Sequence, residues 1–242
     1  MITKTDIQKI LADLAKNSTE PYLSEAQFQF DLAWALQNKA GNYKIKKILL
    51  ECTALMCCNK RFEYDIIVLF EDDTFIAIEL KYKTSEADIN SVRLIQQAGQ
   101  PGTKYDYLWD VRRIELLKTY YSGGVIVSNE YHRNSKILNA ATCLGGYAIF
   151  LTNDGSYYNG NEKSHESAFN FSLRGGRHIP RNTSLDWVYG ASSTPTWMAP
   201  RNPFQFIYDH TLDNWKNFSS YSVVCRKKTG TKHFKYLITE IK

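Results

Sequence analysis

The sequence lacks the features that mark secreted and membrane proteins. No apolar stretch is long enough to span a bilayer, and residues 1–16 are interrupted by charge and have no apolar signal-peptide core. The five cysteines form no repeating ladder of the kind that small secreted proteins use. These absences predict a cytoplasmic protein in a reducing compartment that does not act at a membrane.

Several common catalytic patterns are also absent. The chain has no phosphate-binding loop of the Walker type and no GxSxG nucleophile elbow, so neither ATP use nor serine hydrolysis is supported. Its five histidines are scattered, and none stands in a metalloprotease pattern. Cys52, Cys57 and Cys58 have no Cys or His at a suitable second spacing, which argues against a zinc site.

Positive charge is concentrated towards the C-terminal end of the chain. The 242 residues hold 30 Lys and Arg against 25 Asp and Glu, and residues 155–242 alone hold 12 against 6. A basic region of this kind favours a polyanionic partner such as nucleic acid. A solvated basic surface without a partner explains the same asymmetry equally well.

Apolar periodicity and turn residues predict an α/β fold with a mixed central sheet flanked by helices. Helices are expected at 5–17, 24–41, 85–98 and 105–118, with Pro101-Gly102 as an interruption between the last two. Strands are expected at 44–51, 62–70, 74–83, 124–128, 146–152, 221–226 and 233–241. Residues 1–154 form the predicted core, and the basic, aromatic-rich residues 155–242 form a loop- and strand-rich extension that completes the same domain.

The second of these helices has a specific start signal. Ser24 and Gln27 fit a capping box, in which each side chain bonds to the backbone of the other residue. Leu23 and Phe28 fit the hydrophobic staple that often surrounds such a box. Gly41 is the expected stop. The signature predicts that Glu25 lies in the first helical turn.

The strands at 62–70 and 74–83 should form a hairpin across the polar turn Glu71-Asp72-Asp73. A turn centred on Asp72 places Asp65 opposite Glu79 and Glu63 opposite Lys81. Opposed carboxylates repel one another, and a divalent cation that binds both removes the repulsion. Lys81 shares the strand face of Glu79 and can orient a water for attack on phosphorus. A register slip of one residue would separate the two acids.

At these residues the sequence resembles the PD-(D/E)xK, or restriction-endonuclease-like, nuclease superfamily. Tyr64-Asp65 and Glu79-Leu80-Lys81 carry the resemblance, with Tyr64 in place of the proline. The resemblance covers residues 20–155 and implies that Mg²⁺, or Mn²⁺ in its place, is bound by Asp65, Glu79 and the main-chain carbonyl of Leu80. It also implies a glutamate on the preceding helix, for which Glu25 is the match. The strings at 79–84 and 146–154 resemble an uncharacterised bacterial subgroup.

Further residues are candidates for contacts with the substrate. By the same resemblance, Gln97 in the helix expected at 85–98 touches a phosphate or the attacking water, although a solvated helix face explains it too. Lys83, Lys104 and Arg113 are candidates for contacts along a nucleic-acid backbone. An ion pair between Asp110 and Arg113 that merely supports a helix is the alternative for the last of these.

The C-terminal extension interleaves arginines with aromatic residues. Arginine neutralises phosphates and aromatic rings stack on unpaired bases, so this pattern is typical of a nucleic-acid surface. An irregular folded cap whose aromatic residues are core is the alternative. The residues concerned are Arg174, Arg177, Arg181, Arg201, Tyr157, Tyr158, Trp187, Tyr189 and Trp197.

Together these patterns predict a Mg²⁺-dependent nuclease that hydrolyses phosphodiester bonds in DNA. By resemblance its role lies in defence, repair or recombination, and it can act as a homodimer. A non-catalytic nucleic-acid-binding or complex-forming module that keeps the nuclease fold is the alternative. RNA as the substrate stays open.

Overall fold

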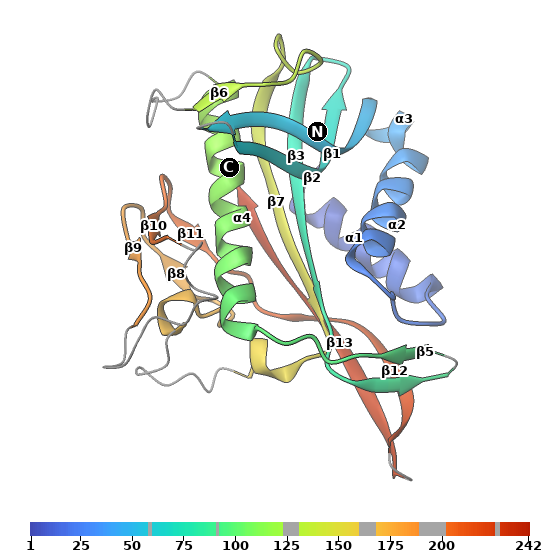
Figure 1. Ribbon diagram of the computed structural model, residues 1–242. Helices are drawn as coiled ribbons and strands as arrows, with labels where there is room; N and C mark the ends of the chain where they lie inside the picture. The colour runs from blue at the N-terminus through green and yellow to red at the C-terminus, as the bar shows by residue number, and fades with distance from the viewer. Residues whose placement is uncertain (58–59, 91, 123–130, 160–167, 189–201, 226–227) are drawn as a thin grey trace. The chain divides into compact units, whose positions relative to one another are not determined.

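A seven-stranded mixed sheet flanked by helices is the largest element of the fold, with strand order β12-β13-β7-β3-β2-β1-β6 (Figure 1). The computed structural model describes residues 1–57, 60–90, 92–122, 131–159, 168–188, 202–225 and 228–242. The chain divides into two compact units. Unit 1 comprises Met1–Leu80, Arg113–Ile149 and Glu240–Lys242, and unit 2 comprises Lys81–Arg112 and Phe150–Thr239. The sequence predicted a core over 1–154, whereas this division assigns 81–112 to the unit that contains most of 155–242.

Unit 1 begins with three helices, α1 (Lys4–Asn17), α2 (Glu25–Asn38) and the short α3 (Ala40–Tyr43). The helix expected at 5–17 is observed as α1, and its apolar side chains Ile7, Ile10 and Leu11 are buried. The prediction for the end of α2 was wrong: the helix stops at Asn38, and Gly41 lies within α3.

The start of α2 is where the sequence placed it, with a different arrangement of side chains. Ser24 Oγ accepts a hydrogen bond from the Gln27 N–H at 3.1 Å, as a cap does. Gln27 Oε1, however, accepts from the Leu23 N–H at 2.8 Å, one residue earlier than a capping box requires. Leu23 is 65% exposed, and Tyr22 packs on Phe28 in its place, with ring centroids 5.2 Å apart.

The strands of unit 1 are β1 (Ile45–Cys57), β2 (Lys60–Phe70), β6 (Tyr131–Arg133) and the first parts of β3 (Thr74–Lys83) and β7 (Thr142–Thr152). β2 and β3 form the predicted hairpin in the predicted register, from Leu69–Phe75 to Ile66–Ile78. In its turn Asp73 has a φ of 56°, and Asp72 Oδ1 accepts from the Thr74 N–H at 3.1 Å. Asp is suited to both roles because it tolerates the left-handed region and bonds to nearby backbone.

Unit 2 contains most of α4 (Gln100–Tyr121) and many short elements. Its core is aromatic: the ring of Tyr105 lies 5.2 Å from Phe171, 5.6 Å from Trp187 and 5.4 Å from Phe204. Unit 2 also contains β4 (Ala87–Ile89), β5 (Val92–Leu94), η1 (Gly155–Tyr157), η2 (Phe169–Phe171), β8 (His178–Ile179), β9 (Ser184–Leu185), β10 (Phe204–Gln205), β11 (His210–Thr211), β12 (Lys216–Cys225) and most of β13 (Lys228–Ile241).

The helix expected at 85–98 was wrong. Its residues form the antiparallel pair β4–β5, and Asn90 between the strands has a left-handed φ of 53°. Pro101 does not interrupt a helix, because it lies in the first turn of α4, where proline is tolerated. The strand expected at 124–128 falls outside the described residues. Among those described, no helix has the length and apolar character needed to cross a bilayer.

β7 packs so closely on β3 at Gly146 that there is no room for a side chain. A Cβ on Gly146 would lie 1.9 Å from the main-chain oxygen of Ala77, whereas one on Gly41 would meet nothing within 4 Å. We expect Gly146→Ala to lower the free energy of unfolding by about 3 kcal/mol or more, because backbone rather than a flexible side chain must move. Gly41→Ala, the control, should change it by less than about 1 kcal/mol. Urea unfolding measures both, and equal stabilities would contradict the packing of these strands.

Candidate active site

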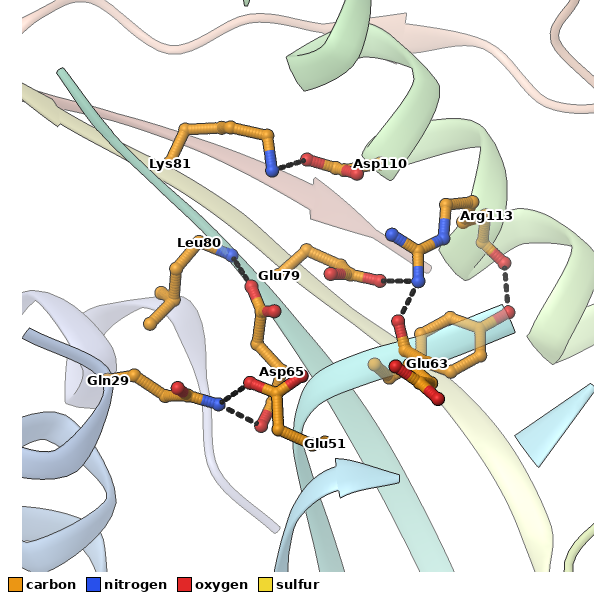
Figure 2. A network of polar contacts seen from close by, with 10 residues as sticks. Gln29, Glu51, Glu63, Asp65, Glu79, Leu80, Lys81, Asp110 and Arg113 are labelled. Carbon is orange, nitrogen blue, oxygen red and sulfur yellow. Dashed lines mark hydrogen bonds and ion pairs between the residues drawn. The ribbon is translucent and has the colours of Figure 1, made fainter. Parts of the chain in front are cut away.

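The candidate site begins where the β2–β3 ladder stops. The last pair is Ile66–Ile78, and beyond it β2 continues to pair with β1 through Tyr64 and Cys52. The Leu80 N–H donates instead to Asp65 Oδ2 at 2.6 Å (Figure 2). The Asp65 side chain therefore takes the place of a main-chain acceptor on β2, and a charged acceptor makes this bond stronger than an ordinary ladder bond.

The end of the ladder corrects both predicted pairings of ionic residues. Its observed pairs include neither Asp65–Glu79 nor Glu63–Lys81, and Glu63 pairs with Thr53 on β1. Asp65 and Glu79 come directly after the last pair of the ladder, one on each arm. The predicted register is thus observed up to the two acidic residues and ends there.

Glu79 is a buried carboxylate with a guanidinium beside it. Its residue is 1% exposed, and Arg113 Nη2 lies 3.3 Å from Glu79 Oε1. A buried charge requires an opposite charge or hydrogen bonds, since removing it from water without them costs several kcal/mol. Arg113 meets this requirement from α4 (Figure 2).

Arg113 is itself held by β2. Its Nη2 also donates to the main-chain oxygen of Glu63, and its guanidinium lies 5.1 Å from the ring centroid of Tyr64 and 6.0 Å from that of Phe62. The Tyr64 hydroxyl donates to the Arg113 main-chain oxygen at 2.9 Å. Burial raises the pKa of the Tyr64 phenol well above its usual value, so the hydroxyl stays a neutral donor. Tyr64, which replaces the proline of the motif, thus fixes Arg113.

From α2, Gln29 contacts the main chain of Asp65. Gln29 Nε2 donates to Glu51 Oε1 and to the main-chain oxygen of Asp65, both at 2.7 Å. Glu25, one turn earlier on α2, is half-buried. A signal was present in the sequence, because Gln29 shares its helical stripe with the apolar Leu32 and Leu36. A polar residue on a buried stripe needs a partner, and here the partners are Glu51 and the Asp65 backbone.

Lys81 is the first residue of unit 2, where its ammonium pairs with Asp110 Oδ2 at 2.9 Å. The side chains of Lys81 and Asp110 are 20% and 4% exposed. The sequence allowed a helix-supporting pair between Asp110 and Arg113. In the structure Asp110 pairs with Lys81 and Arg113 with Glu79, so these two residues of α4 contact two of the predicted catalytic residues.

The remaining candidates near β3 are spread out. Gln97 lies in the irregular segment after β5 and not on a helix, and its N–H donates to the Thr84 main-chain oxygen at 2.9 Å. Lys83 is half-buried at the end of β3. Lys104, near the start of α4, is only 6% exposed.

In the C-terminal extension the arginines have different roles. Arg174 and Arg181 are exposed. Arg177 instead holds a loop together, with Nη1 donating to the Ser172 oxygen at 2.7 Å and Nη2 to the Asn170 oxygen at 2.9 Å. The aromatic residues of this region that are buried, Tyr157 and Trp187, belong to the core of unit 2, and Tyr158 lies under the Lys235 ammonium. Arg201, Tyr189 and Trp197 fall outside the described residues.

The donor types at the hairpin fit a hard divalent cation. Asp65, Glu79 and the main-chain carbonyl of Leu80 supply oxygen, which Mg²⁺ prefers. No group of three or more His, Cys, Asp or Glu side chains suited to a metal occurs in the described part of the chain. Glu51 lies on β1 between the pairs Leu50–Ile66 and Cys52–Tyr64, and its carboxylate accepts from the same Gln29 amide that binds the Asp65 carbonyl.

Comparisons of the chain with protein-family models, with curated proteins and with solved structures found no match. The hairpin itself provides three observations. They are the register of β2 on β3, the bond from the Leu80 N–H to the Asp65 carboxylate, and the places of Glu79 and Lys81 two residues apart on β3.

Asp65 has a structural role at the Leu80 N–H that two variants can test. Asp65→Asn keeps an oxygen acceptor for the Leu80 N–H and removes the charge. We expect it to keep the stability of the wild type within about 1 kcal/mol, whereas Asp65→Ala loses about 1–3 kcal/mol because a buried donor loses its acceptor. Urea unfolding in EDTA measures both, and an alanine variant as stable as the asparagine variant would contradict the capping role.

The three described arginines of the C-terminal extension should differ in how much they contribute to stability. Arg177→Ala should lower the free energy of unfolding by about 1–3 kcal/mol, because two main-chain carbonyls lose a charged donor. Arg174→Ala and Arg181→Ala, as exposed controls, should stay within about 0.5 kcal/mol of the wild type. Thermal unfolding of the three variants measures these differences. If Arg177→Ala is as stable as the wild type, the loop does not need the two Arg177 hydrogen bonds.

Proposed function

We propose that the protein is a Mg²⁺-dependent nuclease of the PD-(D/E)xK type, with a restriction-endonuclease-like fold, that hydrolyses phosphodiester bonds in DNA. The single observation that carries the proposal is the hairpin register. It brings the Asp65 carboxylate to the Leu80 N–H at 2.6 Å, on the arm of β3 that also carries Glu79 and Lys81. Acidic residues on the two arms of one hairpin, followed by a lysine, are the arrangement that this chemistry requires.

Each residue of the hairpin has a distinct task in this proposal. Asp65, Glu79 and the Leu80 carbonyl would hold Mg²⁺ or Mn²⁺, which supplies Lewis acidity to the scissile phosphate and acidifies a water. Gln29 fixes the main chain of Asp65 through the bond to its carbonyl. Because a ligand misplaced by about 1 Å costs much of the rate, this bond supports catalysis without contact with the substrate.

Lys81 is the proposed donor to the attacking water or to a phosphate oxygen. It lies two residues after Glu79, so the alternation of β3 directs both side chains to one face. Asp110 holds its ammonium at 2.9 Å, which limits the rotamers that a long side chain otherwise samples. A donor that is held before the substrate arrives loses less entropy in the reaction.

A second function is favoured by one specific observation. Glu79 and Lys81 both form ion pairs with α4, to Arg113 and Asp110. If these pairs persist, the fold serves as a non-catalytic nucleic-acid-binding or complex-forming module, and the ionic residues stabilise it. The exposed Arg174 and Arg181 suit nucleic-acid binding under either function.

Cleavage of defined nucleic acids distinguishes the two functions. Plasmid DNA, single-stranded DNA and RNA are incubated with the full chain in Mg²⁺, Mn²⁺ or EDTA. We expect DNA cleavage with either metal and none in EDTA. Asp65→Asn and Lys81→Met should lose roughly 10²-fold or more in rate, because each removes charge stabilisation from the transition state. Arg93→Met, which breaks an exposed ion pair of unit 2, is the matched control for Lys81→Met and should cleave normally.

Three outcomes contradict the nuclease. One is cleavage that persists in EDTA, and another is full activity of Asp65→Asn. The third is DNA affinity that falls steeply with salt in the complete absence of turnover, which would establish the binding module instead.

A further inference from the structure

The Glu79 carboxylate already has a cation at hydrogen-bond distance. Arg113 Nη2 lies 3.3 Å from Glu79 Oε1, and the Arg113 side chain is 16% exposed while that of Glu79 is 1% exposed. Little water reaches the pair, so its electrostatic attraction is screened far less than that of a surface pair. Any second cation at this carboxylate must contend with the guanidinium.

Arg113 does not depend on Glu79 for its place. Three contacts hold it from β2: the Glu63 main-chain oxygen, which accepts from Nη2, and the faces of the Tyr64 and Phe62 rings. A fourth contact, from the Tyr64 hydroxyl to the Arg113 carbonyl, holds the α4 backbone. The guanidinium is therefore a positive charge anchored beside Glu79, and it can stay near the carboxylate whether or not the pair is formed.

We propose that Arg113 is the resident counter-ion of Glu79 and competes with the divalent cation for this carboxylate. Arg113 then sets the cation concentration that the site requires. The inference rests on the proposed function in one respect, namely that Glu79 is a metal ligand. It goes beyond that function because neither the motif nor the hairpin assigns a role in metal binding to an arginine of α4.

The positive charge of Arg113 should weaken the binding of a divalent cation to Glu79. In the wild type a divalent cation must displace Arg113 from Glu79 or bind next to its positive charge, and both weaken its binding. Replacing Arg113 by an apolar side chain of similar length removes both penalties and leaves a buried carboxylate without this partner. The variant is thus expected to be less stable than the wild type without metal and to gain more stability when metal is added.

The first experiment measures binding of Mg²⁺ or Mn²⁺ alone to the full chain, with no nucleic acid present, by calorimetry and by thermal unfolding. We expect Arg113→Met to bind either metal about tenfold more tightly than the wild type, because a charge this close is worth at least the free energy of a tenfold change. Lys46→Met, which breaks an exposed ion pair with Asp73 in the same unit, is the matched control and should bind as the wild type does. Equal metal affinities for Arg113→Met and the wild type would overturn the proposal.

Glu79→Gln tests whether the carboxylate is the shared group. In the Glu79→Gln background, Arg113→Met should no longer tighten metal binding, since there is no longer a charge to compete for. An unchanged tenfold effect in that background would place the competition elsewhere and overturn the proposal.

The wild type provides a measurement that does not depend on a variant folding. Side-chain NMR signals of Arg113 should move during a Mg²⁺ titration with the same midpoint as the calorimetric binding. Arg113→Lys, which keeps the charge but not the planar fork, should bind metal with an affinity between those of the wild type and Arg113→Met. Arg113 signals that stay still while Mg²⁺ binds, or no metal binding by any of these proteins, would refute the inference.

The outcomes for the two proposals differ. If Arg113→Met binds metal more tightly but the protein cleaves no nucleic acid, the counter-ion role of Arg113 is supported and the nuclease activity is contradicted. If the wild type and Arg113→Met both cleave DNA and need the same metal concentration for half-maximal cleavage, the nuclease activity is supported and the counter-ion role of Arg113 is contradicted.

Discussion

A carboxylate that is almost wholly buried needs a positive charge or hydrogen bonds to stay charged, and Arg113 supplies a positive charge beside Glu79 in unit 1. The pair requires that the last part of α4 lie against β2 and β3. Tyr64 secures this position because its ring lies under the guanidinium and its hydroxyl binds the α4 backbone. The residue before Asp65 therefore has a physical reason to be a tyrosine here.

The divergence of β2 from β3 is the second constraint. A β-strand that leaves its neighbour exposes main-chain donors that must find other acceptors. Asp65 resolves this at Leu80 and thereby turns its carboxylate towards β3, while Gln29 holds the Asp65 carbonyl from the other side. The same contacts that satisfy the backbone thus place two acidic residues at the end of one hairpin.

The parts of the fold that could be predicted are those with a local cause. The hairpin turn at Asp72-Asp73, the cap at Ser24 and the alternation along β3 each depend on residues close in sequence. The predictions that failed concern features that residues distant in sequence decide. Residues 85–98 were predicted to be helical, although short segments of mixed polarity fit both the helical and the strand period. The structure has a two-stranded hairpin there, with Asn90 in the left-handed region between its strands. Gln29 was missed because its role follows from burial on α2 and not from a place in a motif.

The sequence by itself determined the register of the hairpin and hence which residues stand at its end, because the turn chemistry and the two-residue period of a strand are local properties. Only the tertiary structure decided which partners those residues have. Arg113 and Asp110 lie far along the chain from Glu79 and Lys81, and Gln29 lies far from Asp65. No periodicity encodes such contacts, since they arise when buried charges and polar groups on separate elements must satisfy one another as the elements pack.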